Sequence, residues 1–78
     1  MGRIIIANRH GDQTLEWDPR ADTDEGHAAV RRAEEIIAEA QARGCAISRK
    51  EGTRHVLDRG PFDAQAEEYQ IIAPIAGG

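Results

Sequence analysis

The chain has few of the residues that hold very small proteins together through covalent or metal cross-links. It contains a single cysteine, Cys45, so no disulfide can form within it. No His-Asp pattern surrounds Cys45, and we expect a structural thiol there. The histidines His10, His27 and His55 include no pair at helical i, i+4 spacing, so no metal site is expected. A small domain with neither a disulfide nor a metal site is typical of a reducing compartment, and we expect the cytoplasm.

Long hydrophobic runs and excess positive charge are also missing. No apolar stretch approaches the roughly 20 residues of a membrane span. The start of the chain has only Ile4 to Ala7 as a continuous apolar run, which is too short for a secretory signal. The net charge is −4, so we expect no nucleic-acid partner, and the absence of a long apolar stretch leads us to expect no membrane. With 78 residues the chain forms one domain with a small core.

Aromatic residues and lysine are scarce. Trp17 and Phe62 are each the only residue of their type, and we expect both in the core. Tyr69, the single tyrosine, belongs either to the edge of the core or to a face that docks a partner. Lys50 is the single lysine beside nine arginines, a bias that a G+C-rich genome would also produce.

What is present predicts a mixed α+β fold. Two apolar runs rich in β-branched residues lie near the two ends of the chain. Segments in which apolar and polar residues alternate lie between them. The expected strands are residues 3–8, 14–17, 45–48, 54–58 and 69–73, with one helix over 24–43. Gly11-Asp12 favours a hairpin turn between the first two strands.

The helix prediction rests on an apolar stripe and two end signals. The stripe comprises Ala29, Val30, Ala33, Ile36, Ile37 and Ala40. Asp22, with Glu25 three residues later, can cap its beginning, and Thr23 is the alternative cap. Gly44 suits the left-handed residue that follows a helix. Further along, Val56 and Leu57 are expected to contact the core.

The order β-β-α-β-β-β has consequences for topology. The apolar strands from the two ends of the chain are expected at the centre of the sheet, parallel to each other, with the helix packed across one face. This arrangement resembles the β-grasp, the ubiquitin-like fold. It implies a domain over residues 1–73, with a mixed sheet of four to five strands, and a flexible tail over 74–78.

The ending "EEYQIIAPIAGG" carries the resemblance further. It is similar to the ending of ubiquitin-like modifiers, including bacterial ones, and of sulfur carriers such as the small subunit of molybdopterin synthase. The resemblance implies that the carboxylate of Gly78 is activated, with Gly77 beside it free of a side chain. Pro74, Ile75 and Ala76, together with Tyr69, would then form the tail and partner-docking residues.

The physical logic of such a tail is independent of the family. An activating enzyme must bring a carboxylate to the α-phosphate of ATP through a narrow channel, and Gly77 and Gly78 have no Cβ to collide with its walls. Residues 74–78 can span roughly 17 Å when extended. Pro74 cannot continue a strand ladder and stiffens the exit.

The resemblance implies that the chain is not an enzyme and binds no cofactor, since ATP would be used by the partner. The expected partners are an E1-like adenylating enzyme, an E2-like conjugating enzyme, a JAB-type isopeptidase and target proteins. In a protein modifier, self-linkage could use only Lys50 or the N-terminal amine. Two alternatives stay open: a sulfur carrier with a C-terminal thiocarboxylate, and a noncatalytic assembly protein such as a small phage component.

Overall fold

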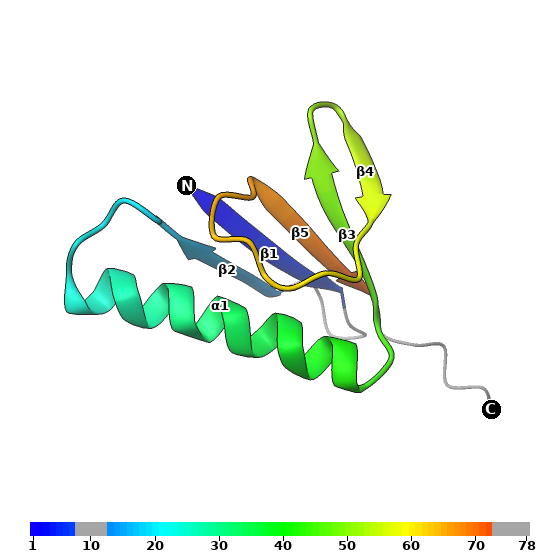
Figure 1. Ribbon diagram of the computed structural model, residues 1–78, viewed down its shortest axis with the longest axis horizontal. Coiled ribbons are helices and arrows are strands. Elements are labelled where there is room, and N and C mark those ends of the chain that lie inside the picture. The colour runs from blue at the N-terminus through cyan, green and yellow to red at the C-terminus, as the bar shows by residue number, and fades with distance from the viewer. Residues whose placement is uncertain (8–12, 73–78) are drawn as a thin grey trace.

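The computed structural model describes residues 1–7 and 13–72, which form one helix and five strands (Figure 1). The elements are β1 (Gly2–Ala7), β2 (Gln13–Trp17), α1 (Asp24–Ala42), β3 (Ala46–Glu51), β4 (Arg54–Leu57) and β5 (Glu68–Ile72). The protein is thus an α+β domain, as the sequence predicts. No helix in the described ranges is long and apolar enough to cross a membrane.

The five strands form one mixed sheet in the order β2-β1-β5-β3-β4. β1 and β5 lie side by side and parallel, with Arg3 opposite Glu68 and Ala7 opposite Ile72. All other neighbours are antiparallel. The two apolar terminal strands are therefore central and parallel, which confirms the topology predicted from the sequence and is compatible with a β-grasp arrangement.

One face of the sheet carries the core, because side chains alternate between the two faces of a strand. Ile4, Trp17, Ile47, Tyr69 and Ile71 all lie on this face and are each at most 4% exposed. The opposite face is covered by none of the described elements, and it carries mainly polar and small side chains.

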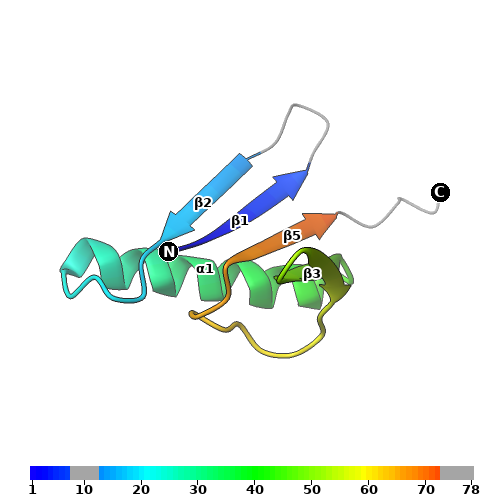
Figure 2. The ribbon, with the colours of Figure 1, turned by 90° about the horizontal axis from the view of Figure 1, so that it is seen from above.

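Helix α1 packs on the core face through the predicted stripe, of which Ala33, Ile37 and Ala40 are buried (Figure 2). Its N-cap is Thr23, whose hydroxyl accepts a hydrogen bond from the Gly26 N–H at 3.0 Å. Of the two predicted N-caps, Asp22 is therefore wrong as a prediction and the alternative, Thr23, is the cap observed. Gly44 follows the helix with φ of +77°, which confirms the predicted left-handed exit.

Residues 58–67 run beside α1 and cover the rest of the core face (Figures 1 and 2). Phe62 lies between Trp17 and Tyr69, with ring centroids 5.0 and 5.8 Å away. The Trp17 indole N–H donates to the Ala64 carbonyl at 2.9 Å. This irregular segment is thus held by aromatic packing and by hydrogen bonds to buried side chains, as expected for Phe62 and Trp17.

Two details of the second half differ from the sequence prediction. Leu57 is 75% exposed, so its predicted contact with the core is wrong, while Val56 is half-buried. The reason is that β4 is an edge strand that pairs only with β3, and Leu57 lies on the uncovered face of the sheet. β3 also continues through the charged residues 49–51, beyond the strand over 45–48 that the sequence predicts.

The Tyr69 hydroxyl gives a prediction about alkaline stability. It accepts a hydrogen bond from the Asp63 N–H at 2.9 Å, and burial raises the pKa of Tyr69 above its ordinary value of 10.0. Because the folded pKa is the higher one, this contribution to stability is full below pH 10 and is lost as pH rises through the folded pKa. Tyr69→Phe should remove this alkaline loss and cost about 1 kcal/mol at neutral pH.

Urea unfolding followed by Trp17 fluorescence measures both effects, and the ultraviolet absorbance of the single tyrosine reports its titration directly. Equal alkaline loss of stability in the Tyr69→Phe protein and the parent would contradict the assignment.

Candidate functional site at the end of strand β5

The end of β5 is the described part of the chain closest in sequence to the predicted functional tail. Ile72 lies between Ala7 of β1 and Ala46 of β3, paired on both sides. The Ile72 side chain is 54% exposed, and both alanines are exposed as well. The strand that precedes the tail is thus fixed at the centre of the sheet. At its end, Ala7, Ile72 and Ala46 form a row of exposed apolar side chains on the uncovered face.

The predicted tail residues Pro74, Ile75, Ala76, Gly77 and Gly78 lie outside the residues that the structure describes, as do Ala73 and His10. Of the predicted docking residues, only Tyr69 is described, and its side chain is 1% exposed. Tyr69 therefore belongs to the core and has almost no surface to offer a partner, so the core position among the two alternatives is the one observed.

A cluster of ion pairs lies at the other end of the same central strands. Glu68, 5% exposed, is a buried charged residue. Its carboxylate accepts a hydrogen bond from Arg3 Nε at 2.7 Å, and His55 Nε2 lies 3.4 Å away. A carboxylate is rarely buried unless it is paired, and the hydrogen-bonded ion pair with Arg3 satisfies that condition.

Sequence analysis missed the role of Glu68, which lies just before the predicted last strand, residues 69–73. In the structure it begins β5, directly opposite Arg3 of β1. The available signal was the pairing itself: once the two terminal strands are aligned by their apolar residues, Arg3 and Glu68 occupy matching positions. That alignment requires a register, which the sequence alone does not specify.

Lys50 lies near this charged cluster and not near the end of β5. It follows Arg49, which pairs with Tyr69, and its ammonium lies 3.5 Å from Glu67. Lys50 and Met1 both line a small pocket of about 230 Å³, beside Glu16. The structure therefore brings together the two residues that carry the chain's primary amines, Lys50 on its side chain and Met1 at its N-terminus.

The remaining candidates lie apart from one another. Cys45 is half-buried where the chain leaves α1, whereas His27 is exposed near the start of the helix. Within residues 1–7 and 13–72, no group of three His, Cys, Asp or Glu side chains is arranged to hold a metal ion.

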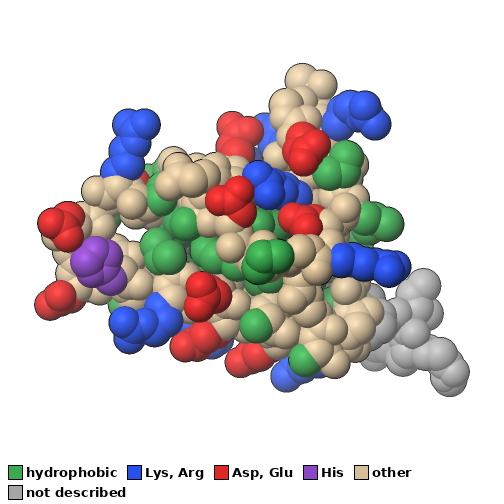
Figure 3. Space-filling view, viewed as in Figure 1, with side chains coloured by type: hydrophobic (Ala, Val, Ile, Leu, Met, Phe, Trp, Pro, Cys, Tyr) green, Lys and Arg blue, Asp and Glu red, His purple; other side chains and the backbone are tan. Residues whose placement is uncertain are grey.

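Charge is unevenly distributed along the molecule. The beginning of α1 carries Asp22, Asp24 and Glu25, and Figure 3 shows acidic side chains on both sides of a histidine at this end. The last turn of the helix contains no basic residue, and Arg43 follows as its C-cap. The net charge of −4 thus describes the whole chain but not each of its surfaces.

Comparison with protein-family models, with curated proteins and with solved structures finds no match for this chain. Function is therefore argued from the residues and their arrangement.

The Glu68 cluster gives a prediction with a neighbouring control. Glu68→Ala removes a carboxylate that is 7% exposed and leaves Arg3 without its hydrogen-bond acceptor, which should cost roughly 1–2 kcal/mol of unfolding free energy. Glu67→Ala removes a 66% exposed carboxylate next to it and should cost under about 0.5 kcal/mol. Urea unfolding measures both, and similar losses for the two variants would show that burial of Glu68 confers no special stability.

Proposed function

We propose that this chain is a ubiquitin-like β-grasp protein modifier whose Gly78 carboxylate is activated and transferred to a target amine. The observation that carries the proposal is the position of β5. It is a central strand parallel to β1, and the sequence that follows it is a proline-containing segment ending in Gly-Gly. The strand order and the single helix on one face are what the β-grasp resemblance implies.

The central position of β5 supports a role for the residues after it. β5 is paired along both edges, and its residues Tyr69 and Ile71 are buried. A partner that engages the tail would therefore be connected to a central strand that is paired on both sides, and not to a sheet edge. Such an attachment suits a body whose task is to present a chain end to an enzyme.

The proposed reaction has three steps. The Gly78 carboxylate attacks the α-phosphate of ATP on an E1-like enzyme, forming an acyl-adenylate and releasing pyrophosphate. A cysteine thiolate of the enzyme, or of an E2-like enzyme that follows it, attacks the acyl carbon; the first such attack releases AMP. A target amine then attacks the thioester, forms an amide and releases the thiol. A cytoplasmic location and a JAB-type isopeptidase that reverses the last step belong to the same proposal.

A sulfur carrier is the second candidate, and the amines of the chain favour it. Lys50 is the only lysine, and its side chain is 31% exposed and paired with Glu67. Few accessible amines protect an activated carboxyl end from attack by other copies of the chain. In this alternative, sulfide replaces the target amine and the product is a Gly78 thiocarboxylate. The third possibility, a noncatalytic assembly protein, requires neither product.

Deletion of Gly78 tests the activation step. The protein is incubated with ATP and activating enzymes encoded beside its gene, and its intact mass is measured. A thioester or an amide conjugate supports the modifier, and replacement of one oxygen by sulfur supports the carrier. Deletion of Gly78 should abolish either product and leave the urea midpoint unchanged, because a glycine has no side chain to contribute to the core.

Equal modification of the shortened and full-length proteins would refute both the modifier and the carrier. Failure of the full-length protein to form either product with every such enzyme would favour the assembly protein.

The pocket shared by Lys50 and Met1 gives a second prediction. If copies of the chain are joined to each other, the linkage should map to Lys50 or to the N-terminal amine, since the sequence offers no other primary amine. Lys50→Arg keeps the positive charge opposite Glu67 and should leave only N-terminal linkage, as read by peptide mass spectrometry. Polymers that persist after Lys50→Arg is combined with acetylation of the N-terminus would contradict this assignment.

A further inference from the structure

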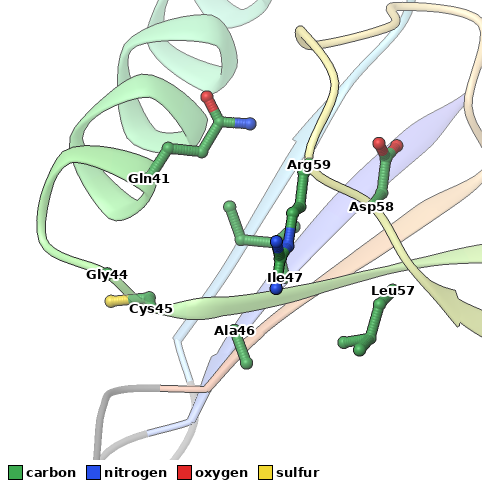
Figure 4. Close-up of a pocket in the computed structure, with 8 residues that line it drawn as sticks. All are labelled: Gln41, Gly44, Cys45, Ala46, Ile47, Leu57, Asp58 and Arg59. Atoms are coloured by element: carbon green, nitrogen blue, oxygen red, sulfur yellow. The ribbon is translucent and has the colours of Figure 1, made fainter.

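A groove of about 470 Å³ lies where the end of α1, the beginning of β3 and the end of β4 meet. Figure 4 shows Gln41 on the helix side, Leu57 on the strand side and Arg59 reaching across the opening near Ile47. We call this the α1–β4 groove. Ala46, which pairs with Ile72, also lines it, so the groove lies next to the end of β5.

The groove offers exposed apolar surface along its strand edge. Ile47 is 4% exposed and belongs to the core face, whereas Leu57, which is 75% exposed, and the exposed Ala46 both lie on the uncovered face of the sheet. Leu57 is thus one of the few large apolar side chains in the described residues that lie mostly in solvent. A single exposed leucine is ordinary, but here it borders a concave surface that an apolar side chain of a partner could fill.

The charge available in the groove is positive. Asp58 also lines it, but its carboxylate accepts a hydrogen bond from the Gly60 N–H at 2.7 Å and lies 3.9 Å from Arg49. Arg59 forms no ion pair with an acidic side chain of residues 1–7 or 13–72. The guanidinium of Arg59 is therefore the charged group of the groove that is left for a ligand.

Three carbonyls and one side-chain amide at the end of α1 are already occupied by hydrogen bonds within the chain. The carbonyls of Glu39, Ala40 and Gln41 accept hydrogen bonds from the N–H groups of residues 43–45. The Gln41 amide donates to the Gly60 carbonyl at 2.7 Å. These contacts leave Arg59 as the main hydrogen-bond donor toward a bound group. Its planar guanidinium can donate two parallel hydrogen bonds to a carboxylate.

From this combination we infer that the α1–β4 groove docks a segment of a partner protein in which an apolar side chain is flanked by carboxylates. The apolar side chain would pack on Leu57 and Ala46, and a carboxylate would pair with Arg59. The net charge of −4 would favour a basic partner, but the local charge of the groove selects an acidic one. The inference does not depend on the chemistry proposed for Gly78.

Three capped synthetic peptides of equal length test the inference, titrated into the full-length ¹⁵N-labelled protein and followed by backbone NMR. The first has a central leucine flanked by glutamates, the second has alanine in place of that leucine, and the third has lysines in place of the glutamates. The first peptide should bind, with shift changes at residues 44–47 and 57–59. The second and third should bind markedly more weakly, because each lacks one of the two required features.

Matched variants test whether the charge of Arg59 contributes to binding. Arg59→Ala should weaken binding of the first peptide by up to roughly fivefold, the size of one exposed ion pair. Arg54→Ala removes the same charge from an exposed site at the beginning of β4 and should leave the dissociation constant unchanged. Leu57→Ser should weaken binding without altering the urea midpoint, because Leu57 makes little contact with the core.

Absence of binding by the first peptide, equal binding of all three peptides, shift changes on another surface, or equal effects of Arg54→Ala and Arg59→Ala would each overturn the inference. None of these outcomes bears on the activation of Gly78, which is read from mass and not from peptide binding.

Discussion

The parallel pairing of β1 with β5 is the constraint on which the rest of the structure depends. Parallel neighbours cannot be joined by a tight turn, so the whole chain between Ala7 and Glu68 serves as the connection between them. That connection supplies α1 and residues 58–67, which together cover the core face of the sheet, and it adds β2 and β3 as outer neighbours of the central pair. The position of Ile72 at the centre of the sheet follows directly from this pairing.

The register of that pair matters as much as its direction. A shift by one residue would move Tyr69 and Ile71 to the uncovered face and bring Gln70 into the core. The ion pair between Glu68 and Arg3 occurs only in the observed register, because it requires these residues to lie opposite each other. Tyr69, next along β5, holds residues 58–67 through Phe62 and the Asp63 N–H. Glu68 thus fixes the alignment of β5 with β1 through the uncovered face of the sheet. The next residue, Tyr69, fixes the packing of residues 58–67 on the core face.

The sequence predicted what local patterns determine and missed what depends on partners distant in the chain. The β-branched runs, the helical stripe and Gly44 predicted the elements, and the apolar character of the terminal strands predicted their central, parallel arrangement. Leu57 was misplaced because a β-branched and apolar pair, Val56-Leu57, does not reveal that β4 is an edge strand with one face uncovered. Residues 49–51 were left out of the predicted strand because their charges do not indicate one; in the structure the long side chains of Arg49 and Lys50 reach the carboxylates of Asp63 and Glu67. The groove at the end of α1 arises only when three separate elements meet, so no single pattern predicted it.

The two ends of the central strands differ in chemistry, and this difference orients any partner that engages the chain end. The Met1 end holds the three carboxylates of Glu16, Glu67 and Glu68. The guanidinium of Arg3, the ammonium of Lys50 and the N-terminal amine of Met1 lie beside them and largely compensate their charges. The Ile72 end offers the exposed side chains of Ile72 and Leu57 and the guanidinium of Arg59. On the proposed function, an enzyme bound to the tail would meet this apolar and cationic end first, while the acidic beginning of α1 would face away. Because screening limits the reach of charges to about 8–10 Å in physiological salt, the local charge at the Ile72 end governs docking more than the net charge of the chain.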